Sequence, residues 1–384
     1  MPISFDVAIV GLGAMGSSAA YHLAGRGLKV IGFDRFDPPH VWGSSHGKSR
    51  MIREAYYEHP LYVPFVRRAF ELWGDLERVA GGPALYRQTG GLMIGPEWSS
   101  LVQGTLRSAV DYDIPHERLS ATEVHRRFPA FTPLEEMIGV LEHRAGILLS
   151  DDIIRAHLAL AADRGAELRT NEQVLGWERV EGGVEVRTAS GEVGARFVVL
   201  SAGAWLEALL PDLPLPLTVE RQVIHWFEPA RFPEYHEPEQ MPVSMWQLAN
   251  GQLFYTKPDT GDGVKFGVHR GGRTTSADAI DRRVSESEDA ESFDLLRRFV
   301  PFAKGSIRAR ATCMYTNTPD TDFILDRHPD APEVLIVSPC SGHGFKFASV
   351  IGETIADLVC TGESRFDLSP FGISRFSSRV LPST

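Results

Sequence analysis

The chain has 384 residues, of which 43% are hydrophobic and 23% charged, and its formal net charge is -11. This length predicts two domains, and the acidic balance excludes nucleic acid and anionic membrane surfaces as partners. No run of 18 apolar residues is present and the first strand leaves no room for a signal peptide, so we expect a cytoplasmic protein without a membrane span. The three cysteines follow no metal-binding or disulfide spacing, so no metal is expected.

The first 35 residues have the order of elements of a dinucleotide-binding unit. A buried strand is predicted over 5–10, a helix over 17–26 and a second strand over 29–33, which ends at Asp34. The turn between the first strand and the helix has the spacing G-x-G-x-x-G. Strand, turn, helix, strand and acid in this order predict a bound dinucleotide, and the motif leaves open whether it is FAD or NAD.

Each position of this motif has a physical reason. Gly11 permits the tight bend, Gly13 lets the backbone approach a pyrophosphate, and Gly16 lets the helix pack close to the strand. The pyrophosphate would lie at the helix N-terminus, where free N–H groups and the helix dipole favour an anion. Asp34 can accept a hydrogen bond from a ribose hydroxyl.

Two further glycine-rich segments favour FAD, which has to be threaded beyond the first motif. Residues 43–53 carry Arg50 and Arg53, which would share one face of a helical turn. Residues 341–346 precede a predicted helix, so their N–H groups and the positive end of its dipole can meet the pyrimidine edge of a flavin. The alternatives are a solvated basic loop for the first segment and an ordinary strand-to-helix turn for the second.

The remaining elements predict a mixed α/β (α+β) fold made of discontinuous segments. The pattern predicts helices and strands of the nucleotide-binding type over 151–164, 167–170, 173–177, 184–188, 197–201, 334–337 and 346–360. Other stretches are richer in aromatic residues, prolines and alternating strand patterns. We therefore predict a Rossmann-like domain from residues 1–83, 141–216 and 319–384, and a mostly antiparallel-sheet domain from residues 84–140 and 217–318.

Six stretches together resemble the monomeric sarcosine oxidase and N-methyltryptophan oxidase family of FAD-dependent amine oxidases. They cover residues 10–16, 37–40, 43–53, 311–315, 322–326 and 341–347. The resemblance extends over essentially the whole chain and is most specific in the second and third glycine-rich segments. It implies an FAD-binding first domain, a substrate-binding second domain and a monomeric enzyme.

The resemblance implies that FAD is attached covalently, through a thioether to Cys313 in the segment Ala-Thr-Cys-Met-Tyr. Outside such a segment, Cys313 would be interpreted as a buried structural thiol. Lys265 is similar to the lysine that lies over the flavin and promotes its reaction with O2. A cation there would stabilise superoxide as it forms, although periodicity alone would make Lys265 an exposed strand residue.

The second glycine-rich segment, residues 43–53, also resembles the part of the family's sequence that lies near the flavin. His46, Ser49 and Arg50 match residues close to the flavin, and we expect His46 and Arg50 to take part in catalysis together with Lys265. Ser45 and Lys48 depart from the family pattern, in which a histidine and an acidic residue are common. These departures concern the local electrostatics around the flavin.

The resemblance places the substrate between cations and aromatic residues. Arg53 and Lys346 match the pair that holds the substrate carboxylate, for which arginine offers bidentate hydrogen bonds and lysine a point charge. His269 matches a catalytic histidine on the substrate side of the flavin, and Tyr255 and Tyr315 match aromatic neighbours of the bound amine. Further positions expected to contact the cofactor are Met15, Arg35, Ser44, Val174, Ala202, Gly203, Trp205, Gly342, Gly344 and Phe345.

The implied reaction is oxidative demethylation of a secondary amino acid. Sarcosine, O2 and water would give glycine, formaldehyde and hydrogen peroxide. Two cations near the amine would lower its pKa, so no general base is needed. Met245 matches a pocket methionine of the sarcosine type, which leaves space for small substrates and favours sarcosine, with N-methyl-L-alanine, L-proline and pipecolate as side substrates.

Three alternatives stay open at this point. Residues 347–353 and 367–371 are more similar to the tryptophan-type relatives, which would favour N-methyl-L-tryptophan or another bulky N-methyl amino acid. The Asp34 motif permits an NAD-dependent dehydrogenase, which would leave Cys313 unexplained. A flavoprotein that has lost catalysis and serves as a binding module would leave Lys265 and Arg53 without a purpose.

Overall fold

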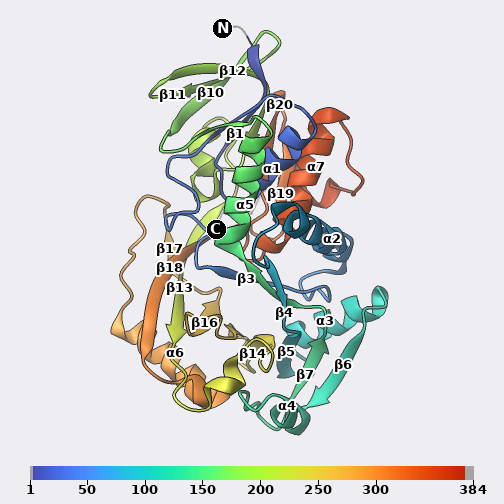
Figure 1. Cartoon of the computed structure of the whole chain (residues 1–384), viewed down its shortest axis with the longest axis vertical. Coiled ribbons are helices and arrows are strands. Elements are labelled where there is room, and N and C mark those ends of the chain that lie inside the picture. Colours follow the sequence, from blue (N-terminus) through green and yellow to red (C-terminus); the bar gives the residue numbers. More distant parts are fainter. Residues whose placement is uncertain (1–2, 377–384) are drawn as a thin grey trace, which may run out of the picture.

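The computed structural model describes residues 3–376, and two large sheets dominate it (Figure 1). Residues 377–384 of the predicted first domain lie outside the described part. Within residues 3–376, no helix is long and apolar enough to cross a membrane. The mixed α/β fold predicted from the sequence is confirmed, and the boundaries between its two domains stay a prediction.

The first sheet, in the upper half of Figure 1, has a parallel centre. Its strands are β1 (Ile3–Val10), β2 (Val30–Phe33), β9 (Glu167–Arg169), β10 (Val174–Val180), β11 (Gly183–Thr188), β12 (Gly191–Leu200), β19 (Ile324–His328) and β20 (Ala331–Ser338). β1 lies between β2 and β12 and pairs in parallel with both. On the outer sides, β2 pairs in parallel with β9, and β12 pairs in parallel with β20. β10, β11 and β19 add antiparallel pairings at the periphery.

Alternating side chains of β1 build a core on each face of this sheet. Val7 and Ile9 pack towards helices α1 (Ala14–Gly25), α2 (Val63–Ala80), α5 (Ser150–Asp163) and α7 (Ala348–Cys360). Ala8 and Val10 pack on the other face with the short helix η2 (Gly203–Leu209). Because both faces are covered, β1 is an apolar run rather than an alternating one.

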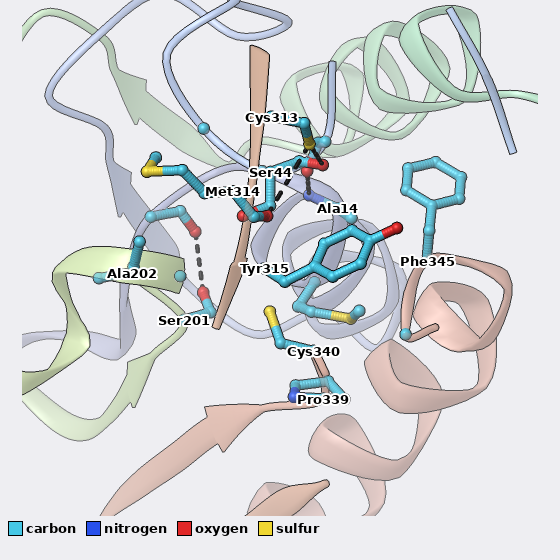
Figure 2. Close-up of a pocket in the computed structure, with 18 of the residues that line it drawn as sticks. Ala14, Ser44, Ser201, Ala202, Cys313, Met314, Tyr315, Pro339, Cys340 and Phe345 are labelled. Atoms are coloured by element: carbon cyan, nitrogen blue, oxygen red, sulfur yellow. Dashed lines mark hydrogen bonds between the residues drawn. The ribbon is translucent and has the colours of Figure 1, made fainter. Parts of the chain in front are cut away.

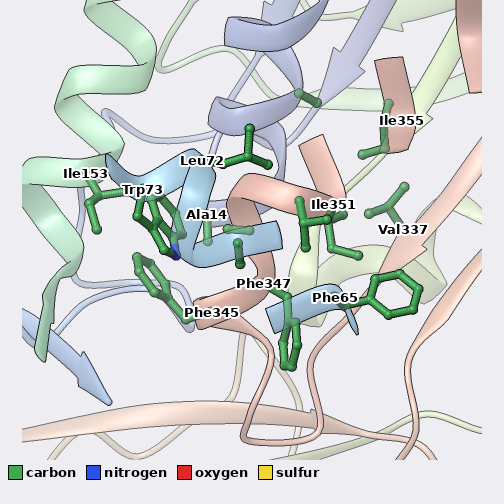
Figure 3. Close-up of a cluster of buried hydrophobic side chains, with 14 of the residues drawn as sticks. Ala14, Phe65, Leu72, Trp73, Ile153, Val337, Phe345, Phe347, Ile351 and Ile355 are labelled. Carbon is green, nitrogen blue, oxygen red and sulfur yellow. The ribbon is translucent and has the colours of Figure 1, made fainter. Parts of the chain in front are cut away.

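The helix-covered core holds the third glycine-rich segment in place (Figure 3). Trp73 of α2 stacks on Phe345, with ring centroids 6.4 Å apart and an interplanar angle of 6°. Its indole Nε1 donates a hydrogen bond of 3.0 Å to the carbonyl of Lys346. Phe345 and Lys346 lie in η5 (Phe345–Phe347), directly before α7, so the packing of α2 fixes the position of the Lys346 side chain.

The second sheet, in the lower half of Figure 1, is antiparallel except where β5 meets β14. Its strands are β5 (Gly91–Pro96), β6 (His116–Ser120), β7 (Met137–Glu142), β13 (Thr218–Phe227), β14 (Val243–Gln247), β15 (Leu253–Lys257), β16 (Val264–His269), β17 (Thr274–Thr275) and β18 (Ile307–Asn317). Phe254 and Phe266 pack with α6 (Glu286–Phe299) on one face. The side chains that alternate with them face the first sheet and form the site described below.

A small third sheet joins segments from both predicted domains. It contains β3 (Ser49–Ile52), β8 (Gly146–Leu149) and β4 (Tyr86–Gln88), in that order. The other elements are α3 (Ser100–Asp111), α4 (Ala121–Arg127), η1 (Pro60–Tyr62), η3 (Pro233–His236), η4 (Pro301–Ala303), η6 (Ser369–Phe371) and η7 (Ile373–Phe376). Arg50 lies in β3, so the helical turn considered for Arg50 and Arg53 is wrong. Pairing of β3 with β8 imposes the extended backbone.

Candidate active site

A cavity of about 330 Å³ lies where the two large sheets meet. All three glycine-rich segments line it, together with β13, β15 and β18 of the second sheet. Figure 2 shows Ser201 and Ala202 on the left of this space and Phe345 on its right, with Ser44 beside Cys313 at the top, Tyr315 in the middle and Cys340 below. Segments separated by some 300 residues of sequence therefore meet at one site.

The glycine turn leaves its backbone open towards the cavity. Gly11 has a φ of +92°, and a Cβ there would lie 2.6 Å from the carbonyl oxygen of Ser201. A Cβ on Gly13, the N-cap residue of α1, would meet only the hydroxyl of Ser45, at 3.3 Å. A ligand can thus approach the start of α1 closely, as the pyrophosphate of FAD requires.

Asp34 lies at the end of β2 and is buried. Its carboxylate accepts hydrogen bonds from the backbone N–H groups of Leu12, at 2.8 Å, and Phe36, at 2.9 Å. The carboxylate thereby ties the glycine turn to the second strand while it lines the cavity. This position suits the ribose hydroxyl of a dinucleotide.

A loop of the second sheet covers the same end of the cavity. Asp278 accepts hydrogen bonds from Arg35, at 2.7 Å, and from the indole of Trp205, at 3.0 Å. The guanidinium of Arg35 lies 6.0 Å from the Trp205 ring centroid, within cation–π range. Arg35 and Trp205 therefore line this end of the cavity together, and their hydrogen bonds to Asp278 hold them in position.

Arg50 holds the second glycine-rich segment in shape. One guanidinium nitrogen, Nη2, donates to the carbonyls of Ser44 and His46, both at 2.7 Å, and Nη1 donates to Ser49 at 2.9 Å. The cation also lies 5.7 Å from the ring centroid of Phe345. It connects the second and third segments next to the cavity.

Cys313 faces the cavity from β18 (Figure 2). Its thiol donates a hydrogen bond of 3.4 Å to the carbonyl of Ser44. Burial alone raises the pKa of Cys313, but the neighbouring His46 and the charges of Arg50 and Lys265 outweigh burial and lower this pKa to about 7. The lowered pKa increases the thiolate fraction of Cys313, and the thiolate is the nucleophilic form of a cysteine.

Two cations and one carboxylate meet at the opposite part of the cavity. Arg53 forms an ion pair of 2.5 Å with Glu58, and the two side chains are 3% and 9% exposed. Burial raises the pKa of Glu58, but the charges of Arg53, His343 and Lys346 lower it to about 2. Lys346 Nζ donates to the carbonyl of His343 at 2.7 Å, and burial together with Arg53 lowers its pKa to about 7.

The second sheet supplies the floor of this region. Tyr255 is the direct cross-strand partner of Met245 and of Gly267, and a Cβ on Gly267 would lie 2.6 Å from the Tyr255 hydroxyl. The glycine therefore gives the phenol ring its space. His269 Nδ1 lies 3.2 Å from the hydroxyl of Tyr315, and burial and Arg270 lower the pKa of His269 to about 3. A neutral imidazole is the result.

The structure brings most of the predicted site residues to this one cavity. Those that line it are Gly11, Gly13, Met15, Asp34, Arg35, Ser44, Arg50, Arg53, Val174, Ala202, Gly203, Trp205, Met245, Tyr255, His269, Cys313, Tyr315, Gly342, Gly344, Phe345 and Lys346. Four others lie behind its surface. They are Gly16, whose Cβ would lie 1.8 Å from the carbonyl of Gly11, and His46, Ser49 and Lys265.

Glu58, His343, Lys257 and Asp278 also line the cavity, although sequence reasoning assigned them no role. A signal existed for Lys257, which lies two residues after Tyr255 and therefore on the same face of a strand. His343 lies inside a recognised motif, and its Nδ1 lies 2.7 Å from the Tyr56 hydroxyl. Among residues 3–376, no group of three His, Cys, Asp or Glu side chains is arranged to hold a metal ion.

The fold and the cavity suit a bound dinucleotide, and comparison with known proteins shows the family to which the chain belongs. A family model described as FAD dependent oxidoreductase (DAO) matches residues 6–358, so the chain belongs to this family. It is 41% identical over 382 residues to a monomeric sarcosine oxidase of Streptomyces avermitilis, which covers 98% of this chain and 99% of the relative. It is 36% identical over 377 residues to an N-methyl-L-tryptophan oxidase of Salmonella dublin, with 98% and 100% covered.

Solved structures show the same fold. The open form of NikD, described as an unusual amino acid oxidase essential for nikkomycin biosynthesis, has a TM-score of 0.85 at 23% identity and covers 97% of this chain and 98% of its own. A glycine oxidase from Geobacillus kaustophilus has a TM-score of 0.80 at 22% identity, with 97% and 98% covered. The predicted family membership is confirmed, and the chain is an FAD-dependent oxidoreductase rather than an NAD-dependent dehydrogenase.

Proposed function

We propose that this enzyme is an oxidase of small secondary amino acids, with sarcosine as its preferred substrate. Sarcosine, O2 and water are converted to glycine, formaldehyde and hydrogen peroxide. The observation that carries the proposal is the buried pair of Arg53 and Lys346, which lines the same cavity as Cys313 and the glycine turn. Paired cations of this kind bind a carboxylate, and the aromatic side chains of Tyr255 and Tyr315 line the same cavity.

FAD is held along the whole cavity and attached through Cys313. Gly13 and the start of α1 receive the pyrophosphate, Asp34 the ribose, and Arg50 with Phe345 lies beside the flavin. The low pKa of Cys313, together with its position in the cavity, supports the covalent bond. When bound, FAD supplies a two-electron acceptor for the hydride equivalent that leaves the N-methyl carbon.

The side chains around the substrate bind and orient it. Arg53 takes up the substrate carboxylate in exchange for Glu58, and Lys346 gains a proton when this negative charge enters, because an anion raises the pKa of a neighbouring lysine. His269 stays neutral and adds no charge. The cations lower the pKa of the substrate ammonium, so that the amine binds with its electron pair free. The pH dependence of activity should therefore show an ionisation of the bound substrate; its absence would contradict this step.

Met245 favours sarcosine over larger substrates. Its side chain is buried, lines the cavity and packs on Met93 of the adjacent strand. N-methyl-L-alanine, L-proline and pipecolate are expected side substrates. N-methyl-L-tryptophan is the second candidate, which the 36% identity to an N-methyl-L-tryptophan oxidase supports. We further propose a cytoplasmic monomer with O2 as oxidant, and division at residues 84, 141, 217 and 319 into the two predicted domains.

Acid precipitation of the purified protein tests the proposal. We expect a yellow pellet from the wild type and a yellow supernatant from Cys313→Ser. Peroxide release from sarcosine, N-methyl-L-alanine, L-proline, pipecolate and N-methyl-L-tryptophan then ranks the substrates. A yellow wild-type supernatant would refute the covalent bond, and a protein that releases no peroxide from any of these amines would refute the reaction.

A further inference from the structure

Two buried lysines lie directly opposite each other in the second sheet. Lys257 of β15 and Lys265 of β16 are cross-strand partners in the antiparallel register. Both side chains leave the sheet on the face that carries Tyr255 and His269, since residues two apart in a strand share a face. Both are almost fully inaccessible to solvent, with 4% and 2% exposed.

The two amines share one hydrogen-bond acceptor. Lys257 Nζ and Lys265 Nζ each donate to the carbonyl oxygen of Ser49, at 3.0 Å in both cases. Lys265 Nζ also donates to the carbonyl of Gly47, at 2.6 Å. The segment 47–49 of the second glycine-rich loop therefore lies against both lysines and is tied to the second sheet by them.

No carboxylate pairs with either amine among residues 3–376. Asp151 acts on Lys265 through its charge alone, Cys313 also faces it, and Arg50 adds another positive charge. Burial, then Lys265 and Arg50, hold the pKa of Lys257 well below its usual range, and Lys346 acts in the same direction. Like charges directly opposite each other in a sheet repel, and two unpaired buried ammonium groups are costlier still.

Only one of the two side chains faces the cavity. Lys257 lines it, whereas Lys265 lies behind the loop, where a Cβ on Gly47 would be 3.3 Å from Lys265 Nζ. The amine that a molecule in the cavity can touch in this structure is therefore Lys257. The lysine singled out by the family resemblance lies one layer further back.

We propose that Lys257 and Lys265 share one positive charge beside the flavin position, and that Lys257 presents this charge to O2. The inference rests on the proposed oxidase function. Reduction of O2 to hydrogen peroxide takes up two electrons from the reduced cofactor and two protons. A cation beside O2 stabilises the negative charge that the first electron creates, and the lysine is not consumed. A proton can pass between the two amines because they contact each other directly, while the common acceptor holds them side by side.

Separate measurement of the two half-reactions tests this role. The variants are Lys257→Met, Lys265→Met and the double variant, with Lys304→Met, at an exposed position, as the matched control. Anaerobic reduction by substrate and reoxidation by O2 are followed by stopped-flow absorbance of the flavin. We expect Lys257→Met to slow reoxidation about tenfold or more, which is a barrier change of at least about 1.4 kcal/mol. Reduction by substrate should change less than reoxidation.

Because the pair carries one charge, the two single substitutions should not multiply in the double variant. Lys257→Gln keeps a donor for Ser49 without the charge, and it should reoxidise as slowly as Lys257→Met. Chloride, titrated into the oxidised protein and followed by flavin absorbance, gives a readout that does not depend on turnover. Its affinity should fall in both single variants and stay unchanged in Lys304→Met.

Several outcomes would overturn the inference. Reoxidation and chloride affinity of Lys257→Met equal to the wild type would remove any role for this charge, and multiplicative effects in the double variant would show two independent charges. Slower reduction with normal reoxidation would make Lys257 a substrate-binding residue. Photoreduction of the flavin allows reoxidation to be measured without a substrate, so an inactive amine panel would refute the proposed function alone. A protein without flavin would refute both.

Discussion

The ion pair between Arg53 and Glu58 predicts that Glu58→Gln lowers the stability of the protein and raises its affinity for the substrate. Glu58 has a pKa of about 2 against 4.5 for an ordinary glutamate, so its charge is favoured in the folded state by about 2.5 pKa units. At 1.36 kcal/mol per unit this is about 3 kcal/mol. Because the pKa is lowered on folding, this contribution is fully present above pH 4.5 and is lost as the pH falls towards 2.

The same substitution should tighten substrate binding. Glu58 occupies the guanidinium of Arg53 at 2.5 Å, where the proposed substrate carboxylate would bind. Removal of this competing charge should lower the KM for sarcosine about tenfold or more. In the wild type the substrate carboxylate has to displace Glu58 from Arg53, and this displacement costs more than the free energy of one pKa unit. Stability and affinity should therefore change in opposite directions in a single variant.

Urea unfolding of the wild type and Glu58→Gln at pH 7, 5 and 3 measures the first effect. We expect the variant to be about 3 kcal/mol less stable at pH 7 and the difference to shrink at pH 3. Glu71→Gln is the control, since Glu71 pairs with Arg68 at 2.5 Å but is largely exposed, and it should cost about 0.5 kcal/mol or less. A difference at pH 7 no larger than that of the control, or one that does not change with pH, would refute this reasoning.

Three other predictions follow from the geometry of the cavity. Gly13→Ala should fold, because its Cβ meets only the Ser45 hydroxyl at 3.3 Å, yet lack flavin absorbance, whereas Gly344→Ala should not fold, because its Cβ would lie 1.6 Å from the carbonyl of Pro339. Circular dichroism and absorbance separate the two, and a yellow Gly13→Ala protein would contradict the pyrophosphate assignment. Asp34→Asn replaces one accepting oxygen by an NH2 donor that faces a backbone N–H group, so it should cost about 1–3 kcal/mol in urea unfolding even without cofactor; unchanged stability would contradict the two hydrogen bonds. Met245→Ala should raise kcat/KM for N-methyl-L-tryptophan relative to sarcosine, and an unchanged ratio would refute the role of Met245 in selectivity.

Local patterns predicted the first strand, turn and helix well. The predicted strand 5–10 and helix 17–26 correspond to Ile3–Val10 and Ala14–Gly25. The helix starts earlier than predicted because Gly13 serves as its N-cap, which places Gly16 inside its first turn. These elements form from neighbouring residues, so the sequence around them contains the necessary information.

Features set by distant segments were harder to predict. The segment around Arg50 is extended because it pairs with β8, about 100 residues later in the chain. Glu58 and Lys257 are charged residues, which in a sequence pattern predict an exposed surface. Only the folded chain shows that Lys257 is buried and that both side chains lie beside other charges, with little access to solvent. Cys313 was found through its family motif, since its thiol becomes unusual only next to His46 and Arg50.

The order of strands in the first sheet has a consequence for biosynthesis. β1 leaves the ribosome first, but its neighbour β12 follows almost 200 residues later, and β20, beside β12, more than 300 residues later. Phe345 and Lys346 emerge after all of these strands. The nascent chain therefore leaves the edge of β1 that faces β12 unpaired for about half of its synthesis, and unpaired strand edges are prone to aggregation. Capture of the flavin becomes a late event, and a ribosome that stalls before residue 340 releases a chain unable to retain it.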